Sequence, residues 1–233
     1  MPDPLVVPRR ARQRTTPRTG WWARAWLRSC EELARDTGDL RDGEALARSG
    51  RFGAVVVIAA MASAVLDPRA DAAVMAQVKV EVLGDDEWEV VVRALAERSG
   101  HAAALESGQL PDDLVDATVE AGVELLPGAA DIETACDCEA WTQPCTHALA
   151  LAVLLGWAMD DDPWLLLLLR GRTREALLDA VADRIEVAGP DSAVEDAAGR
   201  AGRILVLAED APAGHGLADT AVAEYDEAVA NLL

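Results

Sequence analysis

Positive charge is scarce in this chain, and most of what there is lies near its start. The 233 residues include 41 Asp and Glu against 21 Lys and Arg, giving a formal net charge of −20, and Lys79 is the only lysine. Residues 1–30 nevertheless contain seven Arg and a single Asp. Because nucleic-acid phosphates are bound through Lys and Arg, a uniformly acidic protein is a poor nucleic-acid surface. We therefore expect an acidic body with a basic N-terminal arm.

Long apolar segments are also missing. The best runs cover residues 54–66, 147–159 and 164–169. Each is shorter than the ~18 uncharged residues that a membrane-spanning helix needs. The arginines near the start are not followed by the apolar stretch of a secretion signal. We expect a cytoplasmic protein that does not associate with membranes. In that compartment thiols stay reduced, so clustered cysteines are more often metal ligands than disulfides.

The apolar periodicity predicts an α+β protein that is mainly helical with a small antiparallel sheet. The β-branched run 55–58 and the alternation at Val78, Val80 and Val82 predict strands over 51–60 and 75–83, with a turn at 67–69. Residues 38–50 are polar and are expected to form a loop or a broken helix. Helical spacing and end signals predict helices over 21–35, 85–98, 101–105, 111–121, 146–159, 162–169 and 173–184.

Composition divides the chain into three parts. Residues 1–19 are rich in Arg and Pro without apolar periodicity, and we expect them to be disordered. Residues 20–187 are expected to form one domain. Residues 188–233 are acidic, with weak apolar spacing, and are expected to be a loosely structured tail.

Four potential metal ligands stand close together at Cys136, Cys138, Cys145 and His147. Three of the chain's four cysteines and one of its three histidines fall within this stretch. Three thiolates and one imidazole complete the tetrahedral shell that Zn²⁺ prefers. Residues two apart do not share a helix face, so Cys145 should precede a helix and His147 should lie in its first turn. The pattern therefore predicts one structural zinc ion.

Other interpretations of the cluster stay open at this point. The four could be ordinary small residues. Cys136 and Cys138 could form a redox pair, although the usual redox spacing is Cys-x-x-Cys. A catalytic zinc would need a coordination position left open for water.

A structural zinc supplies folding energy, ~10–16 kcal/mol apparent in small fingers, so we expect Cys145→Ser to unfold at least residues 135–159.

The cluster and its surroundings resemble a family, the SWIM zinc finger, and in particular a group of bacterial proteins that contain it. The order Cys-x-Cys followed by Cys-x-His carries the resemblance, which extends over about residues 21–184. Further matching features are Trp141, Pro144, the segment 161–172 with its leucine run ending in Leu-Arg-Gly-Arg, and Trp21, Trp22 and Trp26 upstream.

The resemblance implies a ββα-type zinc finger, with its core at about 131–160, inside a larger domain. It also implies binding to DNA or to proteins, and for bacterial members an association with helicase-like ATPases of the Snf type. Thr146 stands where relatives often carry Lys or Arg, which lowers the positive charge of the finger. We therefore expect a non-enzymatic adaptor that docks onto a protein partner. The alternative is a nucleic-acid-binding zinc finger protein acting in DNA transactions.

A second candidate site is the local basic patch of Arg170, Arg172 and Arg174. These residues can compensate the charge at the end of a helix, or they can contact a phosphate or an acidic partner. His101 and His215 have no partners at ligand spacing and are expected at the surface. Cys30 is expected in the core.

Overall fold

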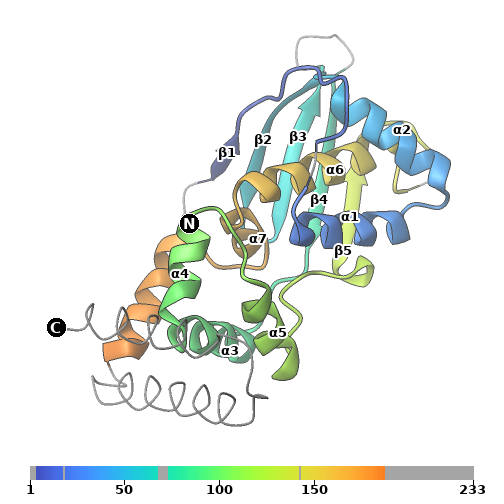
Figure 1. The fold of residues 1–233 in the computed structure, drawn as a ribbon. Coiled ribbons are helices and arrows are strands. Elements are labelled where there is room, and N and C mark those ends of the chain that lie inside the picture. Colours follow the sequence, from blue (N-terminus) through green and yellow to red (C-terminus); the bar gives the residue numbers. More distant parts are fainter. Residues whose placement is uncertain (1–3, 18, 68–72, 142, 187–233) are drawn as a thin grey trace, which may run out of the picture. The chain divides into compact units, whose positions relative to one another are not determined.

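The computed structural model describes residues 4–17, 19–67, 73–141 and 143–186 (Figure 1). Residues Met1–Ala182 form one compact unit, and the predicted acidic tail over 188–233 lies outside the described residues. In chain order the elements are β1 (Leu5–Val7), α1 (Trp21–Leu33), α2 (Thr37–Arg48), β2 (Phe52–Ile58), β3 (Met61–Leu66), β4 (Val74–Val80), α3 (Asp85–Ala96), α4 (Ser99–Glu106), α5 (Asp112–Glu120), η1 (Ala129–Asp131), β5 (Ile132–Cys136), α6 (Thr146–Asp161), α7 (Trp164–Leu169) and a helix over 174–186.

The predicted α+β class is confirmed, with helices around one five-stranded antiparallel sheet in the order β1-β2-β3-β4-β5. β4 and β5 pair, and α6 follows them, so a strand–strand–helix arrangement leads into the cysteine cluster. The two strands of that arrangement are not consecutive hairpin partners, because the helical segment 81–131 lies between them.

The sheet contains more strands than the sequence predicted. β2 turns back at Ala60, which has a positive φ of 67°, and Ile58 pairs with Met61 at the start of β3. β3 reads Met-Ala-Ser-Ala-Val-Leu, and its inward positions include Ala62 and Ala64. Small inward residues give a weak alternation signal, which is why this strand was missed.

The basic arm is ordered over the described residues 4–17, so the prediction of disorder over 1–19 is wrong there. β1 pairs with β2 in the register Val6↔Val56. Arg9 Nε donates to the carbonyl of Gly50 at 3.0 Å, and Arg10 donates to the carbonyl of Trp157 at 3.0 Å. Backbone acceptors thus hold arginines that composition alone assigns to a solvated tail.

The prediction of a loop or broken helix over 38–50 is also wrong, because α2 covers most of it. Asp36 caps this helix by accepting from the backbone N–H groups of Gly38 at 2.7 Å and Asp39 at 2.9 Å. Gly43 and Ala47 are its buried residues, and these small side chains let α2 pack closely on α6. The buried stripe is too small and too weakly apolar to stand out in the sequence.

Helix α6 is the centre of the core. It lies between the sheet and the helices α1 and α2 (Figure 1), and every residue from Ala148 to Met159 is buried. Trp26 of α1 donates its indole N–H to the carbonyl of Ala152 at 2.7 Å. The leucines of α7 are all buried as well, so the leucine run is core. These contacts hold α6 in the core, and α6 also contacts β5.

Candidate metal centre

Cys136 is the last residue of β5 and points to the covered face of the sheet. Across the sheet, Cys136 lies opposite Ala76, Ala76 opposite Ala64, and Ala64 opposite Val55. Ala76, Ala64 and Val55 are all buried. Directly opposite residues of paired strands share a face. The Cys136 thiol therefore lies on the side of the sheet that α6 covers.

The other half of the site is the start of α6. Cys145 is the N-cap residue, with extended backbone angles, and its carbonyl accepts from the N–H of Leu149 at 3.0 Å. Its own N–H donates to the side-chain oxygen of Gln143 at 3.1 Å. His147 follows in the first turn. The predicted placement of Cys145 before the helix and of His147 within it is confirmed.

The fold brings the four predicted ligands together. The Sγ atoms of Cys136, Cys138 and Cys145 and a ring nitrogen of His147 all lie within 4.8 Å of one another. Cys136 Sγ is 3.9 Å from His147 Nδ1. Thiolates around a tetrahedral Zn²⁺ would be roughly 3.7 Å apart, given Zn–S bonds of about 2.3 Å. The cluster is therefore close enough to hold a metal ion after small side-chain movements.

The thiols influence one another. The pKa of Cys136 is raised to about 12, first by burial and also by the neighbouring thiols of Cys138 and Cys145, while a hydrogen bond from the Cys138 backbone acts in the lowering direction. For Cys138, burial also raises the pKa, but hydrogen bonds with His147 and with the Ala140 backbone outweigh it and lower the pKa to about 7. Cys138 therefore ionises more readily than Cys136.

Asp137, between the first two cysteines, ties the loop to the sheet. Its side-chain oxygen accepts from the N–H of Met75 at 2.8 Å, and its own N–H donates to the carbonyl of Met75 at 3.2 Å. Sequence reasoning treated this position as a spacer. Its partner Met75 lies 62 residues away in the sequence, so no local signal marked this role.

Trp141, which the family resemblance singled out, does not enter the core. Its side chain is fully exposed, at 101% of the reference area. It stands in the loop between Cys138 and Cys145, where Glu139, Ala140 and Gln143 are exposed as well.

The predicted basic patch is not an open contact surface. Arg170 is buried, and its guanidinium donates to the carbonyls of Glu81 at 2.7 Å and Glu124 at 2.8 Å, so its assignment as a partner contact is wrong. Burial lowers the pKa of Arg170, and the nearby carboxylate of Asp131 works against this. Gly171 takes a φ of +113°, which favours glycine and turns the chain after the leucine run.

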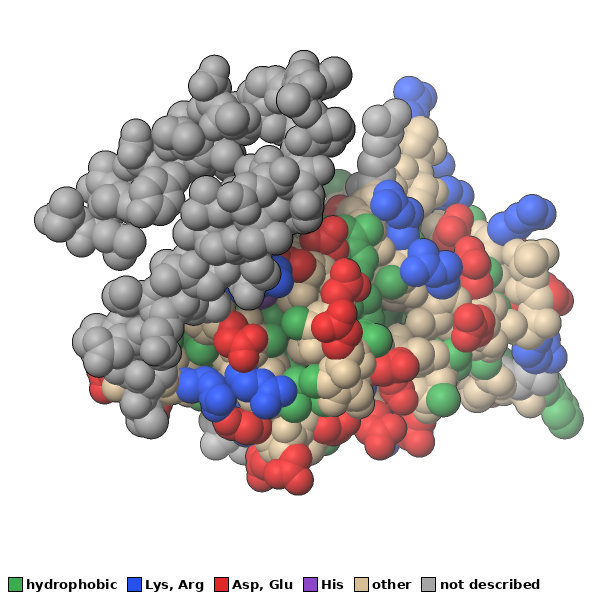
Figure 2. All heavy atoms as spheres, turned by 60° about the horizontal axis from the view of Figure 1, so that its bottom comes forward, with side chains coloured by type: hydrophobic (Ala, Val, Ile, Leu, Met, Phe, Trp, Pro, Cys, Tyr) green, Lys and Arg blue, Asp and Glu red, His purple; other side chains and the backbone are tan. Residues whose placement is uncertain are grey.

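The next two arginines are partly exposed but already have partners within the chain. Arg172 bonds Asp85 at 3.2 Å and lies over the Trp88 ring. Arg174 bonds Glu106 at 2.6 Å and lies over the Trp164 ring. Figure 2 shows basic and acidic side chains interspersed over the described part of this end of the molecule.

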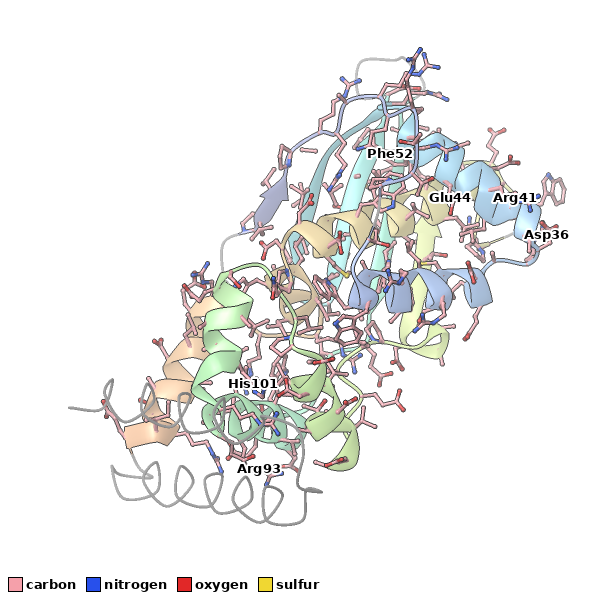
Figure 3. All side chains as sticks on the ribbon, viewed as in Figure 1. Asp36, Arg41, Glu44, Phe52, Arg93 and His101 are labelled. Carbon is pink, nitrogen blue, oxygen red and sulfur yellow. The ribbon has the colours of Figure 1, made fainter. Side chains whose placement is uncertain are left out.

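Of the remaining predicted residues, Cys30 lies where it was expected and His101 does not. Cys30 is fully buried, as predicted. His101 is buried rather than exposed, with Nδ1 2.9 Å from the Ala94 carbonyl and Nε2 3.1 Å from Asp113 (Figure 3). Its partners lie seven and twelve residues away, on α3 and α5, so no local spacing marked it. His215 lies outside the described residues.

No protein-family model matches this chain, and no solved structure matches it. The chain is similar to the uncharacterized protein Rv2102 of Mycobacterium tuberculosis, with 31% identity over 172 residues. The similar region makes up 73% of this chain and 62% of that protein, so this chain spans less than two thirds of its relative. Because the relative is itself uncharacterized, the similarity carries no activity over. Within the part of the chain that the structure describes, no helix is long and apolar enough to span a bilayer.

Proposed function

We propose that this protein is a zinc-stabilised interaction module of the SWIM type, without catalytic activity, that docks onto a protein partner. One observation carries the proposal. Three thiols and one imidazole, from the end of β5, the loop after it and the start of α6, lie within 4.8 Å of one another. A structural zinc at this place would join the sheet to the central helix through the loop 137–145.

The donor set supports zinc over harder ions. Thiolates and imidazole suit Zn²⁺, whereas Mg²⁺ and Ca²⁺ take oxygen ligands. Four protein ligands fill a tetrahedral shell, and catalytic zinc sites normally keep one position for water. The cluster therefore favours a structural role, and with it an adaptor rather than a zinc hydrolase.

The charge distribution supports a protein partner. The formal net charge is −20, and the arginines at 170, 172 and 174 are engaged inside the chain. The SWIM resemblance suggests the kind of partner, a helicase-like ATPase of the Snf type. In this proposal the module serves as a docking platform, and its zinc keeps the docking loop in one conformation.

The deciding experiment measures metal content and coordination on the same purified sample. We expect one zinc per chain and X-ray absorption that fits three sulfurs and one nitrogen. A shell with a bound water would support the hydrolase, and a sample without stoichiometric metal would refute the module. Binding to a purified Snf-type ATPase from the same cell, lost on chelation, tests the docking step. Intact binding after complete zinc removal would contradict it.

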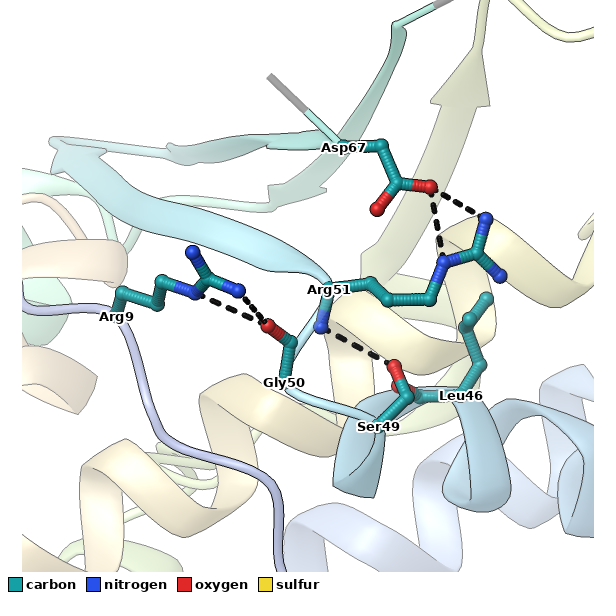
Figure 4. Close-up of polar contacts among 6 residues, drawn as sticks. All are labelled: Arg9, Leu46, Ser49, Gly50, Arg51 and Asp67. Atoms are coloured by element: carbon teal, nitrogen blue, oxygen red, sulfur yellow. Dashed lines mark hydrogen bonds and ion pairs between the residues drawn. The ribbon is translucent and has the colours of Figure 1, made fainter. Parts of the chain in front are cut away.

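Nucleic-acid binding is the second candidate, and one observation favours it. Four arginines lie around the turn at Gly50: Arg9 and Arg12 of the ordered arm, Arg48 of α2, and Arg51 just before β2. Arg14 follows Gln13, whose N–H donates to the carbonyl of Arg48. Figure 4 shows Arg9 on the Gly50 carbonyl and Arg51 bonded to Asp67, with Arg51 Nε 2.9 Å from the carboxylate. Arg12 and Arg14 are exposed.

This candidate is tested by a gel-shift titration with single- and double-stranded DNA at several salt concentrations. Phosphate contacts predict an affinity that falls steeply with salt and that weakens when Arg12 and Arg14 are both replaced by alanine. If no shift is seen at low salt, nucleic-acid binding is excluded and the protein-docking proposal is left in place.

A further inference from the structure

The edge strand β5 presents backbone groups that no described residue uses. The N–H of Glu81 donates to the carbonyl of Asp131, and the N–H of Asp137 donates to the carbonyl of Met75. Antiparallel pairing alternates along a strand, so the backbone of Thr134 is directed away from β4. β5 is the last strand of the sheet, and among the described residues no backbone or side-chain hydrogen bond reaches Thr134 from that side. Such an edge is a template for an added strand.

The loop that follows this edge presents Trp141. Its side chain is fully exposed, and the loop is attached at both ends by residues of the metal cluster, Cys138 and Cys145. Tryptophan is among the residues that contribute most to protein–protein binding when they become buried. A tryptophan on a loop held in one conformation costs little ordering entropy on binding. The edge and the tryptophan are consecutive along the chain.

The charge around both features is negative. Glu133, Asp137 and Glu139 are exposed, and residues 132–147 contain neither Lys nor Arg. Lys79, opposite Glu133 on β4, is the cation that the strand register places beside them. These carboxylates disfavour a nucleic-acid backbone. They also disfavour a second copy of this chain, which would bring the same carboxylates to the shared edge.

We propose that the free edge of β5 and Trp141 together bind an extended basic segment of a partner protein, which joins the sheet as an additional antiparallel or parallel strand. Alternate side chains of that segment lie on the same face as Glu133, where Arg or Lys pairs with the carboxylates. One further cation stacks on the Trp141 ring. The intervening side chains lie on the face of Ile132, where apolar residues fit. This inference rests on the proposed function, because it gives the docking module its surface and its kind of partner.

The test uses the full zinc-loaded chain and three synthetic octapeptides in a calorimetric titration. An alternating Arg-Val peptide provides charge and strand-forming backbone, Glu-Val reverses the charge, and Arg-Pro keeps the charge but lacks every second N–H. We expect Arg-Val to bind, Glu-Val not to bind, and Arg-Pro to bind at least about 10-fold more weakly. Equal binding of Arg-Pro, or no binding of Arg-Val, overturns the proposal.

Two variants locate the binding surface. Thr134→Pro removes an N–H that faces away from β4, so the sheet is kept while strand addition is blocked. Trp141→Ala removes the exposed ring. Each should weaken Arg-Val binding at least about 10-fold, while Thr134→Val should bind like the parent chain. Binding also should slow hydrogen exchange at the Thr134 amide. Unchanged affinity in either of the first two variants overturns the proposal.

The remaining outcomes separate this inference from the function on which it rests. Zinc content is measured on every sample. A chain without zinc refutes the proposed module itself, whereas a zinc-loaded chain that ignores Arg-Val refutes only the β5 surface. Sedimentation without peptide tests whether β5 pairs with β5 of a second copy of this chain. A dimer that dissociates in the Thr134→Pro variant would show such self-pairing and would overturn the proposed basic partner.

Discussion

The loop over 137–145 and helix α6, which follows it directly, are held in opposite ways. In the helix, every residue from Ala148 to Met159 is buried among apolar neighbours. In the loop, Asp137, Glu139 and Trp141 are exposed, and Cys145 at its end is buried. Apolar burial therefore holds the helix without help. The loop depends on its ligands and on a few hydrogen bonds.

The difference indicates where the proposed metal matters. A zinc ion bound at the cluster would stabilise the loop, which has no core of its own, and would add little to a helix that the core already fixes. We therefore expect two separable levels of stability, a local one for the loop and a global one for the domain.

The largest expected effect comes from Cys145→Ser, which tests the loop side of this comparison. The variant should lose the bound zinc, whose apparent contribution in small fingers is ~10–16 kcal/mol. The sequence suggested that residues 135–159 would unfold. Since β5 pairs with β4 and α6 is buried, we expect only the loop 137–145 to unfold. Hydrogen exchange with a parallel zinc measurement should show fast exchange in the loop and continued protection in α6.

Cys30→Ser is the matched control, because Cys30 is buried in α1 outside the cluster. It should lower global stability and keep one zinc per chain. If Cys145→Ser retains stoichiometric zinc, the ligand assignment is wrong. If Cys145→Ser unfolds the whole domain, the expectation of separate stabilities for the loop and for the domain is wrong.

The second-largest effect is expected from Leu151→Ala, which tests whether apolar burial holds helix α6 independently of the loop. Leu151 is completely buried, and truncating such a leucine leaves a cavity that costs about 2–5 kcal/mol of unfolding free energy. Urea unfolding should give a lower midpoint, with zinc content unchanged at moderate denaturant. Loss of zinc at denaturant concentrations that leave the domain folded would show that loop and helix are coupled after all.

A smaller effect is expected from Gly156→Ala, which asks how tightly the helix is packed. A Cβ at this position would lie 2.7 Å from Cδ1 of Trp26. Overpacking of this kind typically costs about 1–3 kcal/mol. Gly100→Ala is the control, because a Cβ there meets nothing within 4 Å and alanine favours the helix. Thermal unfolding should separate the two variants, and equal midpoints would mean that Trp26 moves aside freely.

The sequence allowed the site to be predicted more fully than the fold around it. Ligand type and spacing are local, so Cys136, Cys138, Cys145 and His147 could be identified before any tertiary contact was known. The same holds for α6 and α7, whose continuous apolar runs require burial. The exposed Trp141 and the bridging role of Asp137 depend on where the loop lies against β4, and no local pattern contains that information.

The errors in the fold prediction share one physical cause. β1, β3 and α2 bury few or small side chains. For β1 and α2, the partners are also distant in the sequence, such as Val56 for β1 and Leu149 for Gly43 of α2. Arg170 was misplaced for a related reason, since its carbonyl partners Glu81 and Glu124 lie far away in the chain. Tertiary contacts override composition at each of these positions.

The smallest expected effect concerns the polar contact between helices α4 and α5. His101 of α4 contacts Asp113 of α5 at 3.1 Å, and Arg98 also pairs with Asp113. Burial acts to raise the pKa of Asp113, but the hydrogen bond and charge of His101 and the charge of Arg98 outweigh it and lower the pKa below its ordinary value of 3.8. A carboxyl whose pKa is lowered by folding stabilises the folded state above its unfolded pKa. That stability is lost as the pH falls through the folded value.

Asp113→Asn should therefore lower the unfolding free energy at pH 7 by on the order of 1 kcal/mol, since the pair is partly solvent-exposed. The difference between the variant and the parent chain should shrink below pH 3.8, where the parent carboxyl also becomes protonated. Urea midpoints measured from pH 7 to pH 3 give this curve, and Asp116→Asn, at an exposed position of the same helix, is the control. A difference that stays constant across that range would mean that the carboxylate charge contributes nothing. Apolar packing would then hold α4 against α5, as it holds α6, and the contrast with the loop would extend to this region.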